Sequence, residues 1–99
     1  MNKRLVIEEI VKAATSYGEA IYRYRQSVED VHWQKSSLEN LHRWAREPDS
    51  DGRRKRLKRE ISEMRERLTA STAYSRMLSR RMARLEHAIE IKTRKLARE

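Results

Sequence analysis

The chain contains no cysteine and no phenylalanine, and it has only one proline and two glycines in 99 residues. Without cysteine there are no disulfides, no thiolate nucleophiles and no thiolate metal ligands, which fits a reducing compartment. No stretch approaches the ~20 apolar residues that a membrane-spanning helix needs. The short apolar run near the N-terminus is interrupted by Glu8 and Glu9, so it does not resemble a signal peptide. We therefore predict a cytoplasmic protein that has no membrane partner.

Sequence signatures of catalysis are also missing. There is no glycine-rich phosphate loop, no nucleophile with an evident base and no carboxylate pair at positions that face a second helix. Glu29 with His32, and Glu39 with His42, have the Glu-x-x-His spacing of di-metal helical bundles. Both pairs lie on one predicted helix, about 15 Å apart by helical rise, and the residues opposite them are not ligands. We predict a non-enzymatic protein with no metal site, no cofactor and no small-molecule substrate.

Charge and helical periodicity dominate what the sequence does contain: 39% of the residues are charged, and apolar residues recur in alternating steps of three and four. In the first half the series is Ile7, Ile10, Ala14, Tyr17, Ile21, Tyr24, Val28, Val31, Lys35, Leu38, His42 and Ala45. In the second half it is Leu57, Ile61, Met64, Leu68, Ser71, Ser75, Leu78, Met82, Leu85, Ile89, Lys92 and Leu96. The two series match best in opposite directions, with Tyr24 opposite Ser75 and Ile7 opposite Lys92. The predicted fold is all-α: an antiparallel two-helix hairpin with coiled-coil-like packing along this seam.

A short polar segment separates the two series. Pro48 cannot continue a helix, and Asp49, Ser50 or Asp51 can accept hydrogen bonds from the first amides of a following helix. We predict one domain over residues 1–99. Its elements are helix one at about 3–46, a loop at about 47–51 and helix two at about 52–98.

Two residues bear on the geometry of helix one. Asn2 is a suitable N-cap, because its side-chain oxygen can accept from the free amides of the first turn. Gly18 lies in the helix interior, where glycine costs about 1 kcal/mol relative to alanine. We therefore expect a slight bend or a close contact at Gly18.

Further apolar residues flank the seam and widen the apolar stripe of each helix. On helix one they are Val6, Ala13, Ala20 and Leu41, and on helix two they are Ala70, Tyr74, Met77, Ala88 and Ile91. Stripes wider than a two-per-heptad seam suit a four-helix bundle better than an isolated pair of helices. We predict a homodimer in which two hairpins form a four-helix bundle.

Positive charge is concentrated in the second half of the chain. Residues 1–52 hold 8 Lys and Arg against 9 Asp and Glu, whereas residues 53–99 hold 16 against 6. The densest group, called here the basic cluster, is Arg53, Arg54, Lys55, Arg56, Lys58 and Arg59, and a basic stripe continues through Arg76, Arg80 and Arg84. Cations are disfavoured at a helix N-terminus, so helix stability does not explain the cluster. It either binds a polyanion or is neutralised by Glu47, Asp49 and Asp51 of the loop.

Four side chains of helix one, three of them aromatic, recur every eleven residues, which places them on one face nearly opposite the seam. They are Val11, Tyr22, Trp33 and Trp44, called here the aromatic row. Exposed aromatic residues are typical of partner surfaces. A second copy, another protein or a kink that turns the row inward would each account for it. Stacking of single-stranded nucleic acid is a weaker option, because the aromatics and the cations lie on different helices.

We predict an interaction protein that acts as an adaptor, assembly factor or regulator. Tyr22, Trp33 and Trp44 are the expected anchors for another protein, and the arginines of helix two are expected to steer it electrostatically. The alternative is a nucleic-acid-binding regulator or architectural protein, in which the basic cluster and the basic stripe contact phosphates with little sequence preference.

Overall fold

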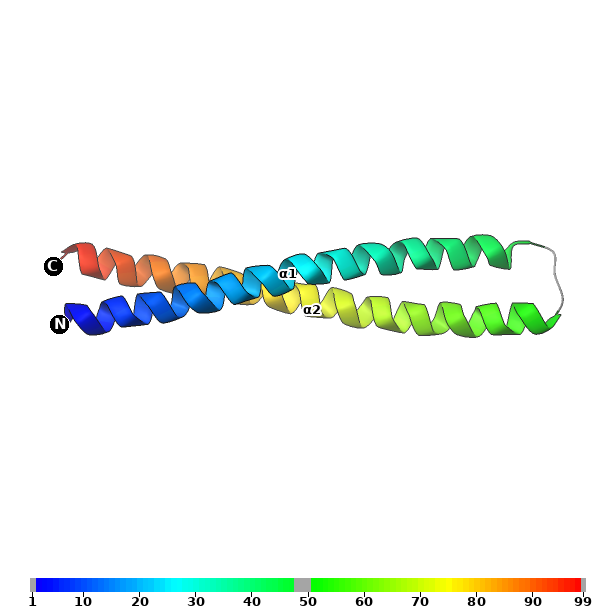
Figure 1. Ribbon diagram of the computed structural model, residues 1–99, viewed down its shortest axis with the longest axis horizontal. Coiled ribbons are helices and arrows are strands. Elements are labelled where there is room, and N and C mark those ends of the chain that lie inside the picture. The colour runs from blue at the N-terminus through cyan, green and yellow to red at the C-terminus, as the bar shows by residue number, and fades with distance from the viewer. Residues whose placement is uncertain (1, 48–50, 99) are drawn as a thin grey trace. The chain divides into compact units, whose positions relative to one another are not determined.

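The computed structural model describes residues 2–47 and 51–98, and almost all of them are helical (Figure 1). Helix α1 runs over Lys3–Ala45 and helix α2 over Asp51–Arg98. The prediction of an all-α chain with two helices that pack on each other is confirmed. Pro48, Asp49 and Ser50 lie outside the described residues, as does the side chain of Asp51, so their predicted capping role stays a prediction.

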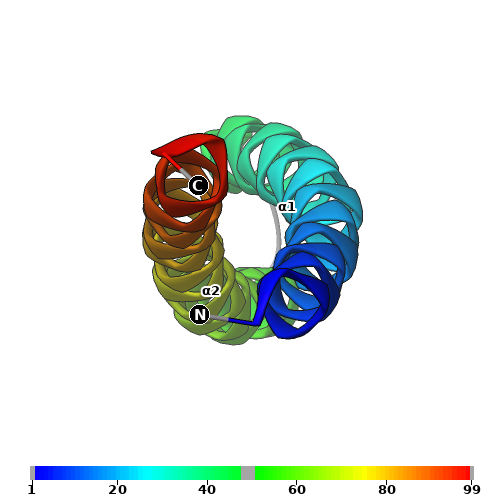
Figure 2. The ribbon, with the colours of Figure 1, turned by 90° about the vertical axis from the view of Figure 1, so that its left-hand side faces the viewer.

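The helices form two compact units. The first unit pairs α1 up to Arg25 with α2 from Arg76 onward, and the second unit pairs the segments between Gln26 and Ser75. In each unit the two segments run antiparallel (Figure 1). Viewed from the end that carries both termini, the first turns of α1 and the last turns of α2 are neighbouring helices of the first unit (Figure 2).

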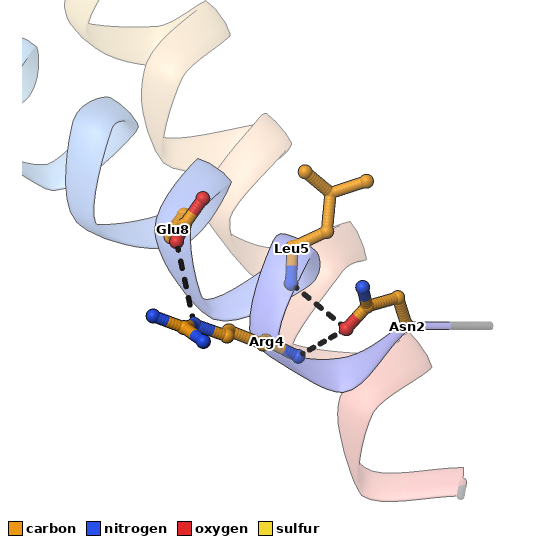
Figure 3. Close-up of polar contacts among 4 residues, drawn as sticks. All are labelled: Asn2, Arg4, Leu5 and Glu8. Atoms are coloured by element: carbon orange, nitrogen blue, oxygen red, sulfur yellow. Dashed lines mark hydrogen bonds and ion pairs between the residues drawn. The ribbon is translucent and has the colours of Figure 1, made fainter.

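The start of α1 is capped as the sequence predicts. The Asn2 Oδ1 atom accepts hydrogen bonds from the backbone N–H groups of Arg4, at 3.0 Å, and Leu5, at 3.4 Å (Figure 3). These are two of the four N–H groups that a helix start leaves without a backbone partner. At the other end, the N–H of Arg46 donates to the carbonyl of Arg43, and the N–H of Glu47 donates to that of Trp44, both at 3.2 Å. Each of these bonds joins residues three apart, instead of the four of an α-helix, so the last turn is narrower and the helix ends there.

The seam of α2 is confirmed, because all twelve predicted positions are buried or half-buried. On α1 one of the two interleaved sets is confirmed throughout, and the other is confirmed only at Ile21 and His42, which are half-buried. The positions of the first set are Ile10, Tyr17, Tyr24, Val31, Leu38 and Ala45. The other side of the seam is Val6, Ala13, Ala20, Ser27, Gln34 and Leu41, each one residue before a predicted position.

The prediction was therefore wrong for Ile7, Ala14, Val28 and Lys35, which are exposed. A shift of one residue along a helix is a rotation of about 100°. The predicted set and the observed set therefore lie on either side of the confirmed positions, and each could form a continuous stripe with them. The two sets hold the same number of apolar residues, so the sequence pattern alone does not distinguish them. The set that is actually buried contains Ala13, Ala20 and Ser27, whose small side chains allow closer helix packing.

The interhelical contacts reflect the corrected seam. In the second unit the Ser75 hydroxyl donates to the Ser27 Oγ atom at 2.8 Å, whereas the prediction placed Tyr24 opposite Ser75. In the first unit the Lys92 Nζ atom lies 3.5 Å from a carboxylate oxygen of Glu9. The side chain of Ser27 is buried, so its hydrogen bond to Ser75 fixes the register of this layer.

The core is thin. Its buried apolar residues are Val6, Ala20 and Leu78 in the first unit and Leu41 and Leu57 in the second. Leu78 is the most enclosed of them, at 1% exposure. Each helix buries one stripe and leaves the rest of its surface to solvent, as expected of two paired helices without further layers.

Gly18 shows no close contact in the described part of the chain. A Cβ atom built at this residue has no neighbour within 4 Å, and its φ is not positive. The predicted close contact is therefore not found among residues 2–47 and 51–98, and the backbone at Gly18 does not require glycine.

Candidate interaction surfaces

The predicted anchors are exposed, with Trp33 at 69%, Tyr22 at 64% and Trp44 at 47%. The two tryptophans lie in the second unit and Tyr22 lies in the first. The ring of Trp33 makes an edge contact with the ring of His32, at a centroid distance of 6.1 Å. Exposure at these three positions argues against a kink that turns them inward.

A groove of about 290 Å³ adjoins Trp44 in the second unit. Its lining is Ser37, Asn40, Leu41, Trp44, Glu60, Glu63, Met64 and Arg67. Trp44 was predicted to lie nearly opposite the seam. Because the seam includes Leu41, Trp44 instead lies at its edge, beside Leu41 and Met64.

This groove, called here the Trp44 groove, is hollow on its α1 side because smaller residues lie between two large ones. Trp33, Ser37, Asn40 and Trp44 recur in steps of four, three and four, so they share one face of the helix. The two tryptophans stand at the ends of this stretch, and the two smaller residues stand between them. The sequence therefore produces a hollow next to Trp44, bounded on the other side by α2.

The α2 side of the Trp44 groove is charged. Glu60, Glu63 and Arg67 line it, and in the described part of the chain neither glutamate takes part in an ion pair. Two carboxylates against one guanidinium give this wall a net negative charge. Sequence reasoning missed these residues. The signal available was their recurrence in steps of three and four beside the α2 seam at Leu57, Ile61 and Met64.

The basic cluster lies in the second unit, and all six of its side chains are exposed. Arg53 lies 3.9 Å from a carboxylate oxygen of Glu47, the one loop-side contact of the cluster among the described residues. Neutralisation by the loop therefore extends to one cation in the part of the chain that the structure describes. The contributions predicted for Asp49 and Asp51 fall on residues whose side chains are outside it.

The basic stripe lies in the first unit, so the structure groups it separately from the basic cluster. Arg76, Arg80 and Arg84 are exposed on α2. Arg84 and Arg81 border a shallow hollow of about 560 Å³. Its other lining residues are Met77, Leu85 and Ala88. Arg81 was not singled out in the sequence, although it adjoins Arg80.

The histidines do not form a metal site in the described residues, where no group of three His, Asp or Glu side chains is placed to hold an ion. The His42 Nε2 atom instead lies 3.4 Å from a guanidinium nitrogen of Arg65 on α2. Within residues 2–47 and 51–98, neither helix has a segment long and apolar enough to cross a membrane. The cytoplasmic location stays a prediction.

Comparisons of the chain with models of protein families, with curated proteins and with solved structures return no match. The functional argument therefore rests on the surfaces described above.

Proposed function

We propose that this protein is a non-enzymatic helical-hairpin interaction protein, an adaptor, assembly factor or regulator that binds a segment of another protein. The observation that carries the proposal is the Trp44 groove. It combines an exposed aromatic wall, an apolar base at Leu41 and Met64, and a polar rim. An aromatic anchor with apolar surface beneath it and polar groups around it is the usual composition of a protein-binding hot spot.

The charge of the Trp44 groove selects the chemistry of the partner. Glu60 and Glu63 favour a cationic side chain, and the face of the Trp44 indole attracts cations as well. The apolar base favours an aliphatic side chain next to that cation. We infer that the partner presents an amphipathic helix in which an apolar anchor is followed one turn later by Lys or Arg.

Selection from a displayed library of random helix-length peptides tests this function. Peptides are selected on the wild-type protein and counter-selected on the Trp44→Ala variant. The control is Tyr22→Ala, because Tyr22, which the sequence also predicts as an anchor, lies in the first unit and does not line the groove. The expected result is a family of peptides with an apolar anchor and a basic residue one turn away. Failure to enrich any peptide that distinguishes wild type from Trp44→Ala would remove the groove as a binding site.

We also propose that the protein acts as a homodimer, in which two hairpins form a four-helix bundle. The thin core supports this, since Ile7, Val11 and Val28 remain exposed on α1. Self-association would cover such residues and leave the Trp44 groove accessible.

A second candidate function is a nucleic-acid-binding regulator or architectural protein, supported by the six exposed cations of the basic cluster. Binding of fluorescent single- and double-stranded oligonucleotides across a series of salt concentrations tests it. Replacing Arg53, Arg54, Lys55 and Arg56 with Gln should reduce the slope of log K against log salt by about 3 to 4 for double-stranded DNA. Absence of binding at low salt would eliminate this candidate.

A further inference from the structure

A row of residues, all but the last of them exposed, follows α1 through the first unit. The row, called here the Gly18 stripe, is Ile7, Val11, Ala14, Gly18 and Ile21, and its members recur in steps of four, three, four and three. Ile7 is 48% and Val11 is 58% exposed, Ala14 and Gly18 are exposed, and Ile21 is half-buried. This spacing is the same as that of the seam, so the stripe has the pattern of a second helix-packing surface.

Within the described residues, no contact accounts for the glycine at position 18. Its missing side chain makes room for nothing, because a Cβ atom at this residue would meet no atom within 4 Å. Glycine is nevertheless unfavourable in a helix interior. Glycine at this position is explained if a helix from outside the hairpin packs against α1, because Gly18 and the nearby Ala14 allow the closest approach of a second backbone.

The central part of the stripe is symmetric about residue 16. Ala14 corresponds to Gly18 and Val11 corresponds to Ile21, so small faces small and β-branched faces β-branched, while Ile7 corresponds to Arg25 just beyond the stripe. A two-fold symmetric contact needs this kind of self-complementarity. We propose that the Gly18 stripe is the contact surface of a symmetric dimer, in which α1 of a second copy lies antiparallel across it. This inference rests on the self-association proposed above and assigns its surface.

The charges beside the stripe agree with a second copy in this direction. Glu8 adjoins the stripe at one end, where Arg4 lies 3.8 Å from its carboxylate (Figure 3). Arg25 is exposed one turn beyond Ile21, at the other end. Antiparallel pairing about residue 16 places Arg25 of one copy level with Ile7 of the other, one residue, about 1.5 Å of helical rise, from Glu8. Within one copy, these two residues are 17 positions apart on a single helix, about 26 Å, so they do not interact.

The flank of the stripe tolerates a covering helix. The Thr15 hydroxyl donates to the carbonyl of Val11 at 2.9 Å, so this polar group already has a partner when water is excluded. Covering this flank with a second helix would therefore leave the Thr15 hydroxyl hydrogen-bonded.

Sedimentation equilibrium over a range from low micromolar to near-millimolar protein tests the assignment. We expect the wild type to dimerise, and Gly18→Leu to raise the dissociation constant about tenfold or more, because the larger side chain prevents close approach. Glu19→Leu, which adds the same side chain on another face of α1, should leave the constant unchanged. Circular dichroism of each variant establishes that the helices remain folded.

A charge exchange tests the antiparallel direction. Glu8→Arg and Arg25→Glu should each weaken dimerisation, and the double variant should restore it toward the wild-type constant. Since the two residues do not meet within one copy, restoration reports a contact between copies.

The outcomes separate the two proposals. A wild type that stays monomeric at every concentration overturns both the self-association and the Gly18 stripe as its surface. A wild type that dimerises equally well with Gly18→Leu overturns the stripe alone. A double charge variant no better than the single ones overturns the antiparallel arrangement.

Discussion

The two units share one construction and expose different chemistry. In both, a segment of α1 packs antiparallel on a segment of α2 through a seam with the same spacing. In the first unit α1 exposes the aliphatic Gly18 stripe. In the second unit it exposes Trp33 and Trp44, next to carboxylates of α2. The difference indicates that the seam positions determine this fold, while the positions beside the seam determine which side chains each unit exposes.

The largest expected effect concerns the core of the first unit. Leu78→Ala removes the most enclosed side chain and should lower the free energy of unfolding by about 2–5 kcal/mol. Leu57→Ala in the second unit should cost less, because Leu57 is more exposed and close to the start of α2. Urea denaturation of both variants measures this difference, with the exposed Met77→Ala as a control. Equal losses would show that the two units contribute equally to stability.

The next effect contrasts the aromatic residues of the two units. Trp44→Ala should weaken the binding of a groove-selected peptide by about tenfold or more, as expected for a central aromatic anchor. Tyr22→Ala should leave the affinity unchanged, because Tyr22 lies in the first unit and the groove is in the second. Fluorescence titration of the labelled peptide measures both. If Tyr22→Ala were as damaging as Trp44→Ala, the two units would not bind independently.

A smaller effect concerns the polar layer of the second unit. Ser27→Ala should lower the free energy of unfolding by about 1 kcal/mol, because a buried hydroxyl loses its hydrogen bond to Ser75. Ser75→Ala should cost less, since Ser75 is only half-buried. A double-mutant cycle on thermal unfolding measures the coupling between the two hydroxyls. A coupling of zero would mean that this hydrogen bond adds nothing to stability.

The smallest expected effect is a gain. Gly18→Ala should raise the stability of the monomer by about 0.5–1 kcal/mol, because alanine has the higher helix propensity and its Cβ fits without contact. Gly52→Ala should gain less, since Gly52 is the second residue of α2 rather than an interior one. Thermal unfolding at low protein concentration separates this gain from any loss of self-association. A destabilising Gly18→Ala would show that the helix needs glycine at this position.

The sequence was sufficient for most of the fold. Prolonged periodicity specified two helices, and on α2 it specified every seam position, because only one pair of series there is apolar. On α1 two adjacent series compete, since Ile7 and Ile21 are as apolar as Val6 and Ala20. The choice between them depends on how side chains of α2 fill the space opposite, and this information is not in the pattern of α1 alone.

The candidate surfaces were predictable only in part. The exposure of Trp33 and Trp44 was indicated by the sequence, although Trp44 lies at the edge of the seam rather than opposite it. The Trp44 groove also depends on Glu60, Glu63 and Met64, which reach it only after the helices have taken their register. Surface chemistry on one helix is readable from its periodicity, whereas a hollow between two helices requires their packing.

The antiparallel pairing also has a consequence for the order of folding. Contacts in the second unit join residues on either side of the connecting segment, such as His42 with Arg65, whereas Glu9 and Lys92 of the first unit are separated by almost the whole chain. Closing a short loop costs less conformational entropy than closing a long one. We expect the second unit to form first and to bring Arg25 and Arg76, the inner ends of the two segments of the first unit, near each other. The second unit then already restricts the long segment between the two parts of the first unit, so pairing these parts costs less conformational entropy. The surfaces of the first unit are complete only at this last step of folding.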